Sequence, residues 1–163
     1  MAGFLCPRAK KELKTMSFTS CLAVAFGGAL GSLARYMLSV AAQPISGSLP
    51  WGTIIINILG SFIIGLFGTL TLAQGRYPVS ENVRLLVMVG ICGGFTTFSS
   101  FSLQTLDLMR TGAMGRAAVN VIASVVLCVG AVALGHFTAT WFNRDVRIVQ
   151  FAIEEESGPV QTS

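Results

Sequence analysis

Long stretches without a charged residue are the feature that most constrains how this chain can fold. Twenty uncharged residues separate Lys14 from Arg35, and forty separate Arg35 from Arg76. Two further uncharged stretches cover residues 85–106 and 117–143. A helix needs about 20 apolar residues to cross the hydrocarbon core of a bilayer. The chain is therefore predicted to be an all-α integral membrane protein.

The composition excludes the soluble and the disordered classes of protein. Charged residues make up 11% of the chain and hydrophobic residues 53%, whereas a soluble domain carries about 25% charged residues. A disordered chain has the opposite combination, low hydrophobicity with high net charge. We therefore expect the lipid bilayer to surround the protein, and we expect no nucleic acid as a partner.

Turn-forming residues divide the apolar stretches into four predicted spans. Residues 43–50 contain two prolines and a glycine, which end the first span. The predicted spans cover about residues 18–42, 51–74, 83–109 and 117–142. They form a membrane domain, residues 16–148, between a basic arm at 1–15 and an acidic tail at 149–163 that is expected to be disordered.

Charges at the span ends bear on the orientation of the chain in the membrane. The side that holds both chain ends has eight Lys or Arg residues and the other side has three, so the ends are expected in the cytoplasm. Met16 is a second candidate start. A chain that begins there has four such residues against three, and this near balance predicts insertion in both orientations.

Polar residues inside the spans are informative, because each costs free energy unless it meets a partner or a pathway. Thr53, Asn57 and Ser61 follow one another at intervals of four residues and share one helix face. Asn120 and Ser124 have the same spacing in the fourth span. One interpretation is hydrogen bonding between helices, worth about 0.6 kcal/mol per contact. The other is a ladder of neutral donors along a pathway.

The third span combines glycines with hydroxyl side chains. Residues 89–102 contain three glycines and five Ser or Thr residues. Glycine lowers helix propensity by about 1 kcal/mol relative to alanine, and Ser and Thr compete for backbone groups, so a helix break at mid-membrane is predicted. Gly90 and Gly94 also fit a seam for close packing, as do Gly27 and Gly31 in the first span. We expect these four glycines to make the contacts of an obligate dimer.

Three motifs follow one another within residues 18–142. Residues 27–36 are GGALGSLARY, residues 52–57 are GTIIIN, and residues 90–101 are GICGGFTTFSSF. They resemble the glycine-rich first helix, the GTxxVN motif and the GxxGGxTTFSTF motif of the CrcB/Fluc family of fluoride channels. Ser100 stands where the family has the second Thr of TFSTF.

The resemblance implies an architecture and a function. Members form antiparallel, dual-topology homodimers in the cell inner membrane, with two narrow fluoride pores and a structural sodium ion at the dimer centre. They export fluoride passively and so lower its toxicity inside the cell. By resemblance, the chain is expected to be a channel and not an enzyme.

The resemblance also assigns roles to residues. The sodium ion would be held by main-chain oxygens at Gly93 and Thr96 from both subunits. The positions that match the fluoride pathway are Asn57, Phe98, Phe101, Thr53 and Ser124. Two positions depart from the family pattern, because Gln104 stands where many members have Glu and Asn120 where they often have Tyr or His. Both departures bear on the conduction rate.

The chemistry of these residues is compatible with fluoride conduction. The Asn57 amide and the Ser and Thr hydroxyls can donate hydrogen bonds to an anion. Phe98 and Phe101, three residues apart, can present the positive edges of their rings. No Lys or Arg lies deep within a span, because Arg35 and Arg84 fall towards the ends of theirs; a fixed cation deep in the pore would bind the anion too tightly for release.

A small dual-topology multidrug-type exporter is the alternative, because such exporters also use four spans and antiparallel dimers. Their proton coupling needs an acidic residue inside the membrane. Spans one, two and four contain none, and Asp107 lies near the end of span three. The sequence therefore favours a channel over a proton-coupled exporter.

Overall fold

The computed structural model describes residues 17–72 and 77–157, with side chains described up to Asn143. This part of the chain consists of helices joined by turns. The elements, in order, are α1 (Phe18–Ala41), the short 3-10 helix η1 (Gln43–Ile45), α2 (Trp51–Leu70), α3 (Glu81–Arg84), the π-helix η2 (Leu85–Cys92), α4 (Gly93–Phe95), α5 (Phe98–Arg110) and α6 (Met114–Ser157).

The four predicted spans are confirmed, with small shifts at their ends. The segments long and apolar enough to cross a membrane are Phe18–Ala41, Trp51–Leu70, Glu81–Arg110 and Met114–Asn143. The second ends at Leu70 instead of near residue 74, and Arg84 caps this end. The Arg84 Nη1 group donates to the Thr71 carbonyl at 2.9 Å and to Thr71 Oγ1 at 2.8 Å. A cation placed there satisfies carbonyls that the helix end leaves without a donor.

The C-terminal segment differs from its prediction. α6 continues beyond the membrane-length segment and ends at Ser157, so residues 149–157 are helical and the expectation of a disordered tail is wrong for them. Propagating an existing helix adds one hydrogen bond per residue without a new nucleation cost. The basic arm at 1–15 and residues 158–163 lie outside the described residues.

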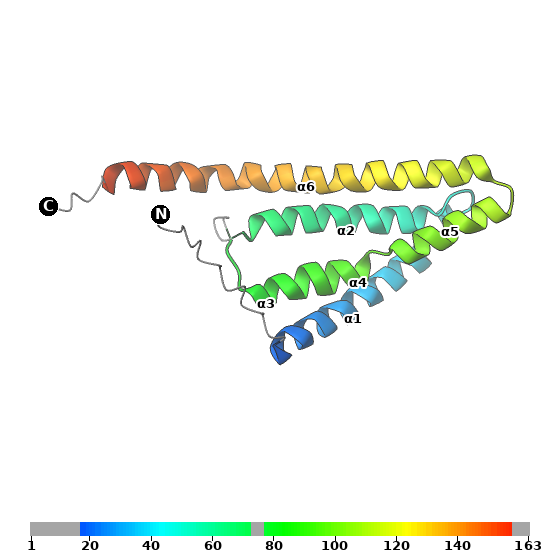
Figure 1. Cartoon of the computed structure of the whole chain (residues 1–163), viewed down its shortest axis with the longest axis horizontal. Coiled ribbons are helices and arrows are strands. Elements are labelled where there is room, and N and C mark those ends of the chain that lie inside the picture. The colour runs from blue at the N-terminus through cyan, green and yellow to red at the C-terminus, as the bar shows by residue number, and fades with distance from the viewer. Residues whose placement is uncertain (1–16, 73–76, 158–163) are drawn as a thin grey trace, which may run out of the picture.

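The helices associate as two pairs (Figure 1). α2 lies along α6, and α1 lies along η2 and α4, while α5 packs against the first half of α6. Many large apolar side chains face outward; Phe26, Ile122 and Val129 are more than 60% exposed. In a membrane helix such surfaces contact lipid or another membrane helix. The arrangement is that of a multi-pass membrane protein.

Glycines allow the backbones of α2 and α6 to approach closely. A Cβ atom on Gly65 would meet the Val132 carbonyl, and one on Gly135 would lie 2.8 Å from the Leu66 nitrogen. The backbone cannot move aside as a flexible side chain can. Small residues at such crossings are the usual means of helix association in membranes.

The glycines of the first and third spans pack within one chain. A Cβ on Gly90 would lie 2.9 Å from the Gly27 Cα, and a Cβ on Gly94 would lie 2.6 Å from the Gly28 carbonyl oxygen. A Cβ on Gly31 would meet the backbone at Ile91. The expectation that these glycines make the contacts of a dimer is wrong, because backbone of the same chain already fills the space that a second subunit would need.

A π-helix opens the third apolar segment, and sequence reasoning did not predict it. Residues Leu85–Cys92 form this wide helix, with Gly90 and Cys92 buried. π-helical turns are rare and occur mostly inside α-helices. Here the π-helix carries Gly90 against α1, so the seam with α1 runs along it.

We predict that the Gly28–Gly94 contact tolerates a methyl group on one side only. Gly94→Ala should lower the free energy of unfolding by about 1–3 kcal/mol, the usual cost of overpacking. Gly28→Ala is the matched control at the same contact, because a Cβ there has nothing within 4 Å. Thermal unfolding of both purified variants in detergent checks this, and equal melting temperatures would contradict the seam.

Candidate functional site

The third apolar segment is interrupted between α4 and α5. α4 ends at Phe95, and Thr96 and Thr97 have extended backbone dihedrals, with φ −76° and ψ 157° at Thr96 and φ −151° and ψ 112° at Thr97. The helix resumes at Phe98. Two consecutive extended residues separate the backbone groups that a continuous helix would pair, so those groups need other partners.

Asn57 of α2 supplies two of these partners. The Thr97 N–H donates to Asn57 Oδ1 at 2.8 Å, and Asn57 Nδ2 donates to the Thr97 carbonyl at 3.1 Å. The primary amide of Asn has two N–H donors and one oxygen. Asn57 thus binds both sides of one residue and still has one N–H available.

Two further features help to hold the interruption in place. A Cβ on Gly60, one turn beyond Asn57 on α2, would meet the methyl group of Thr96, so the glycine leaves room for this side chain in its present position. Thr97 Oγ1 accepts the Ser100 N–H at 3.2 Å and so caps the start of α5. Sequence reasoning missed Gly60, because its effect depends on which helix faces it.

These bonds release two main-chain carbonyls. In a continuous helix the N–H of residue 97 donates to the carbonyl of Gly93, and that of Ser100 to the carbonyl of Thr96. Here the first donates to Asn57 and the second to the Thr97 hydroxyl. The oxygens of Gly93 and Thr96, the expected sodium ligands, are therefore freed from their helical donors. Carbonyl oxygens are the ligand type that a hard cation prefers, so the residues present fit such an ion.

A cavity of about 390 Å³ lies beside the interruption. It brings together most of the residues expected at the pathway and the cation site: Asn57, Gly93, Thr96, Phe98, Phe101 and Ser124. The Phe98 and Phe101 rings lie on one face of α5, with centroids 5.3 Å apart and planes inclined by 49°. Phe98 is 78% exposed. One copy of the chain therefore leaves the Phe98 side of the cavity uncovered.

Ser124 and Asn120 have different environments on α6. Ser124 is 7% exposed and lines the cavity, and its hydroxyl has no hydrogen-bond partner in the described part of the chain. Asn120 is fully buried, and its Nδ2 donates to Thr105 Oγ1 at 2.8 Å. Asn120 thus joins α6 to α5, while Ser124 lines the cavity with a hydroxyl that no described residue uses.

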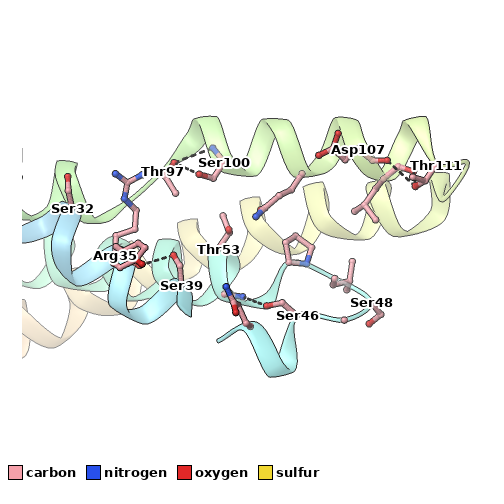
Figure 2. A pocket seen from close by; sticks show the side chains of 18 residues that line it. Ser32, Arg35, Ser39, Ser46, Ser48, Thr53, Thr97, Ser100, Asp107 and Thr111 are labelled. Carbon is pink, nitrogen blue, oxygen red and sulfur yellow. Dashed lines mark hydrogen bonds between the residues drawn. The ribbon is translucent and has the colours of Figure 1, made fainter. Parts of the chain in front are cut away.

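Thr53 lies in a second cavity, of about 640 Å³ (Figure 2). This cavity opens between α1, the η1 turn and α5, and Thr97 lines both cavities. Arg35 and Asp107 also line it. The sequence places Arg35 at a span end and within the first motif, but it does not show which helix faces Arg35. Gln104 lines the same cavity, and its Oε1 is buried without a partner among the described residues.

No cluster of metal-binding side chains accompanies these cavities within the described residues. There, no group of three or more His, Cys, Asp or Glu side chains could hold a metal ion. The two freed main-chain carbonyls are a different kind of candidate ligand, which no such cluster of side chains includes.

The chain is similar to a large set of known proteins. Residues 22–136 match the family model described as CrcB-like protein, Camphor Resistance (CrcB). A protein from Gluconobacter oxydans named Fluoride-specific ion channel FluC is 71% identical over 144 residues, which is 87% of this chain and 100% of the relative. A protein of the same name from Methylobacterium radiotolerans is 72% identical over 142 residues, 86% of this chain and 99% of the relative. The chain belongs to the CrcB-like protein family.

Proposed function

We propose that this chain is a fluoride-specific ion channel of the cell inner membrane, which lets fluoride leave the cell passively and so limits its toxicity. The observation that carries the proposal is the identity above 70% to relatives that bear this name, over nearly their whole length. Passive conduction through a pore requires no catalytic group. The protein is a channel and not an enzyme.

The chemistry of the smaller cavity supports this function. Fluoride holds its water tightly, so a pore must replace that water with hydrogen-bond donors. The Ser124 hydroxyl and the second N–H of Asn57 are neutral donors in the cavity. The ring edges of Phe98 and Phe101 add weak positive potential. No Lys or Arg lines this cavity, so a bound anion can leave it again.

The larger cavity fits the role of an entrance. Arg35 lines it together with several hydroxyl side chains, and Asp107 lines it at some distance from Arg35 (Figure 2). A cation at a pore mouth raises the local concentration of anions. Thr97 lines both cavities, and the proposed path for an anion runs from Arg35 past Thr97 to Phe98. Thr53 contributes a hydroxyl to this entrance and not to the smaller cavity.

A second copy of the chain would complete the pathway. Phe98 is 78% exposed at the cavity, and a membrane protein pore has to exclude lipid. We propose an antiparallel homodimer in which the partner covers this face. The alternative, a multidrug-type exporter, is less well supported. Its proton coupling needs an acidic residue inside the membrane, but no acidic residue lines the smaller cavity, and Asp107 at the larger cavity lies near the end of its span.

A sodium ion at the dimer centre is the proposed cofactor. The carbonyls of Gly93 and Thr96, contributed by both copies, would hold it. Bound there, the ion would supply a fixed positive charge that binds the two interruptions to each other. Its role would be structural, and fluoride alone would be transported.

The first functional prediction concerns the phenylalanine rings. Phe98→Ile and Phe101→Ile keep the apolar bulk but remove the ring edge, which is worth about 0.5–1.5 kcal/mol in aromatic contacts, so each should slow fluoride efflux about two- to tenfold. Efflux from liposomes is measured with a fluoride electrode, with chloride as the excluded ion. Phe137→Ile, at an exposed position on α6 outside both cavities, is the control. Wild-type efflux in both pore variants would contradict the assignment.

The second concerns the cation. Replacing sodium with N-methylglucamine at constant ionic strength should lower the melting temperature of the purified protein, because an ion that binds only the folded form stabilises it. Fluoride efflux should fall under the same condition. An unchanged melting temperature in verified sodium-free buffer would overturn the site.

The third concerns orientation. In a variant that begins at Met16, Ala113→Cys places a thiol in the turn between α5 and α6. With nearly balanced charges, roughly half of these thiols should react with a membrane-impermeant reagent added to cells. The full chain, whose arm adds four positive charges, is the comparison and should favour one orientation. Labelling of all or none of the Met16 form would contradict dual insertion.

A further inference from the structure

We propose that Asn57 is a positioning residue whose side chain keeps the Gly93 carbonyl available for the cation and holds Phe98 at the fluoride cavity. The resemblance assigns Asn57 only to contact with fluoride. The inference rests on the proposed function and deepens it, because it links the two ion sites through one amide. Its basis is the pair of hydrogen bonds between Asn57 and Thr97.

The first step is a competition for one backbone donor. The N–H of Thr97 can donate to the Gly93 carbonyl, as in a continuous helix, or to Asn57 Oδ1. In the structure it donates to Asn57 at 2.8 Å. Thr97 is 7% exposed, so water is a poor substitute for either acceptor. Without Asn57, the acceptor available to this N–H is the Gly93 carbonyl.

The second step extends the effect to the other carbonyl. Because Asn57 Nδ2 also donates to the Thr97 carbonyl at 3.1 Å, the whole residue is held with its hydroxyl at the start of α5. That hydroxyl accepts the Ser100 N–H at 3.2 Å and so removes this donor from the Thr96 carbonyl. Thr97 therefore frees both proposed cation ligands, and Asn57 holds Thr97.

The third step connects the cation to the anion. Thr97 lies directly between Thr96, whose carbonyl is a proposed cation ligand, and Phe98, which lines the cavity. A return of Thr97 to helical dihedrals would rotate everything that follows it, including Phe98 and Phe101. The side chain of Asn57 can still give its second N–H to fluoride. Its positioning role and its donor role are thus separable by mutation.

An ordinary interhelical hydrogen bond is the competing explanation. In that case, loss of Asn57 would lower stability equally in the presence and absence of sodium. The positioning role predicts instead that the response to sodium itself is lost. The dependence of the melting temperature on sodium concentration distinguishes the two.

The experiment compares two substitutions of Asn57 in the full-length protein. Asn57→Leu is similar in size and removes both bonds, so it should lower the apparent sodium affinity about 10- to 100-fold, as loss of a residue that orients metal ligands does. Asn57→Asp keeps an oxygen to accept the Thr97 N–H but loses the donor to the Thr97 carbonyl, so it should weaken the sodium response less than Asn57→Leu does, while its carboxylate abolishes fluoride efflux. Melting temperatures are recorded across sodium concentrations, with N-methylglucamine as the balancing cation.

Ser61→Ala is the matched control, because Ser61 lies one turn further along the same face of α2 and lines the same cavity. It should leave the sodium response unchanged. A wild-type sodium response in Asn57→Leu would overturn the inference. Equal loss of the response in Asn57→Leu and Asn57→Asp would overturn it as well, because only the first removes the acceptor.

A second pair of variants applies if Asn57→Leu does not fold. Thr97→Val removes the hydroxyl that accepts the Ser100 N–H, whereas Thr97→Ser keeps it. The sodium response should be lost in Thr97→Val and retained in Thr97→Ser, and equal behaviour of the two would contradict the mechanism. If the wild-type protein itself shows no response to sodium, the proposed cation site fails. A wild-type response that persists in the Leu and Val variants refutes only the positioning role.

Discussion

Inside a bilayer, a backbone N–H or C=O group must find its partner within the protein, and the arrangement around the third span follows from this constraint. The interruption at Thr96 and Thr97 leaves backbone groups without helical partners. Asn57 satisfies both groups of Thr97, and the Thr97 hydroxyl satisfies the Ser100 N–H. The same bonds leave carbonyls of Gly93 and Thr96 without helical donors. The hydrogen bonds that satisfy the backbone at the interruption thereby leave main-chain oxygens that a cation could bind.

Close backbone approach holds the interruption in place. Gly90 and Gly94 bring the third span against α1, and Gly60 admits the Thr96 side chain against α2. Each contact joins backbone or a short side chain to backbone, so it leaves little freedom for adjustment. Asn57 can reach Thr97 because α2 lies this near. The helix pairs and the interruption therefore depend on each other.

Much of the candidate site could be predicted from the sequence. The intervals of three and four residues placed Phe98 beside Phe101 and Asn57 on the face of α2 that lines the cavity. Thr53 shares that face but lies in the other cavity, because α2 passes from one cavity to the other along its length. Helical spacing indicates which residues share a face of a helix. It does not indicate which neighbouring helices cover each part of that face. For the same reason Gly60, Arg84 and the π-helix carried no recognisable signal.

The sequence by itself determined the class of protein and its spans, because uncharged stretches of about 20 residues have few stable alternatives to a membrane helix. It also indicated the glycine seams and the weak point in the third span, since both follow from local composition. Only the tertiary structure decided that the seam of Gly27, Gly31, Gly90 and Gly94 lies within one chain and that Asn57 binds Thr97. The two residues are 40 positions apart in the chain, and which helices pair is a property of the whole packing arrangement. Local periodicity determines which residues share a helix face. Which helix faces contact each other depends on the packing of all the helices together.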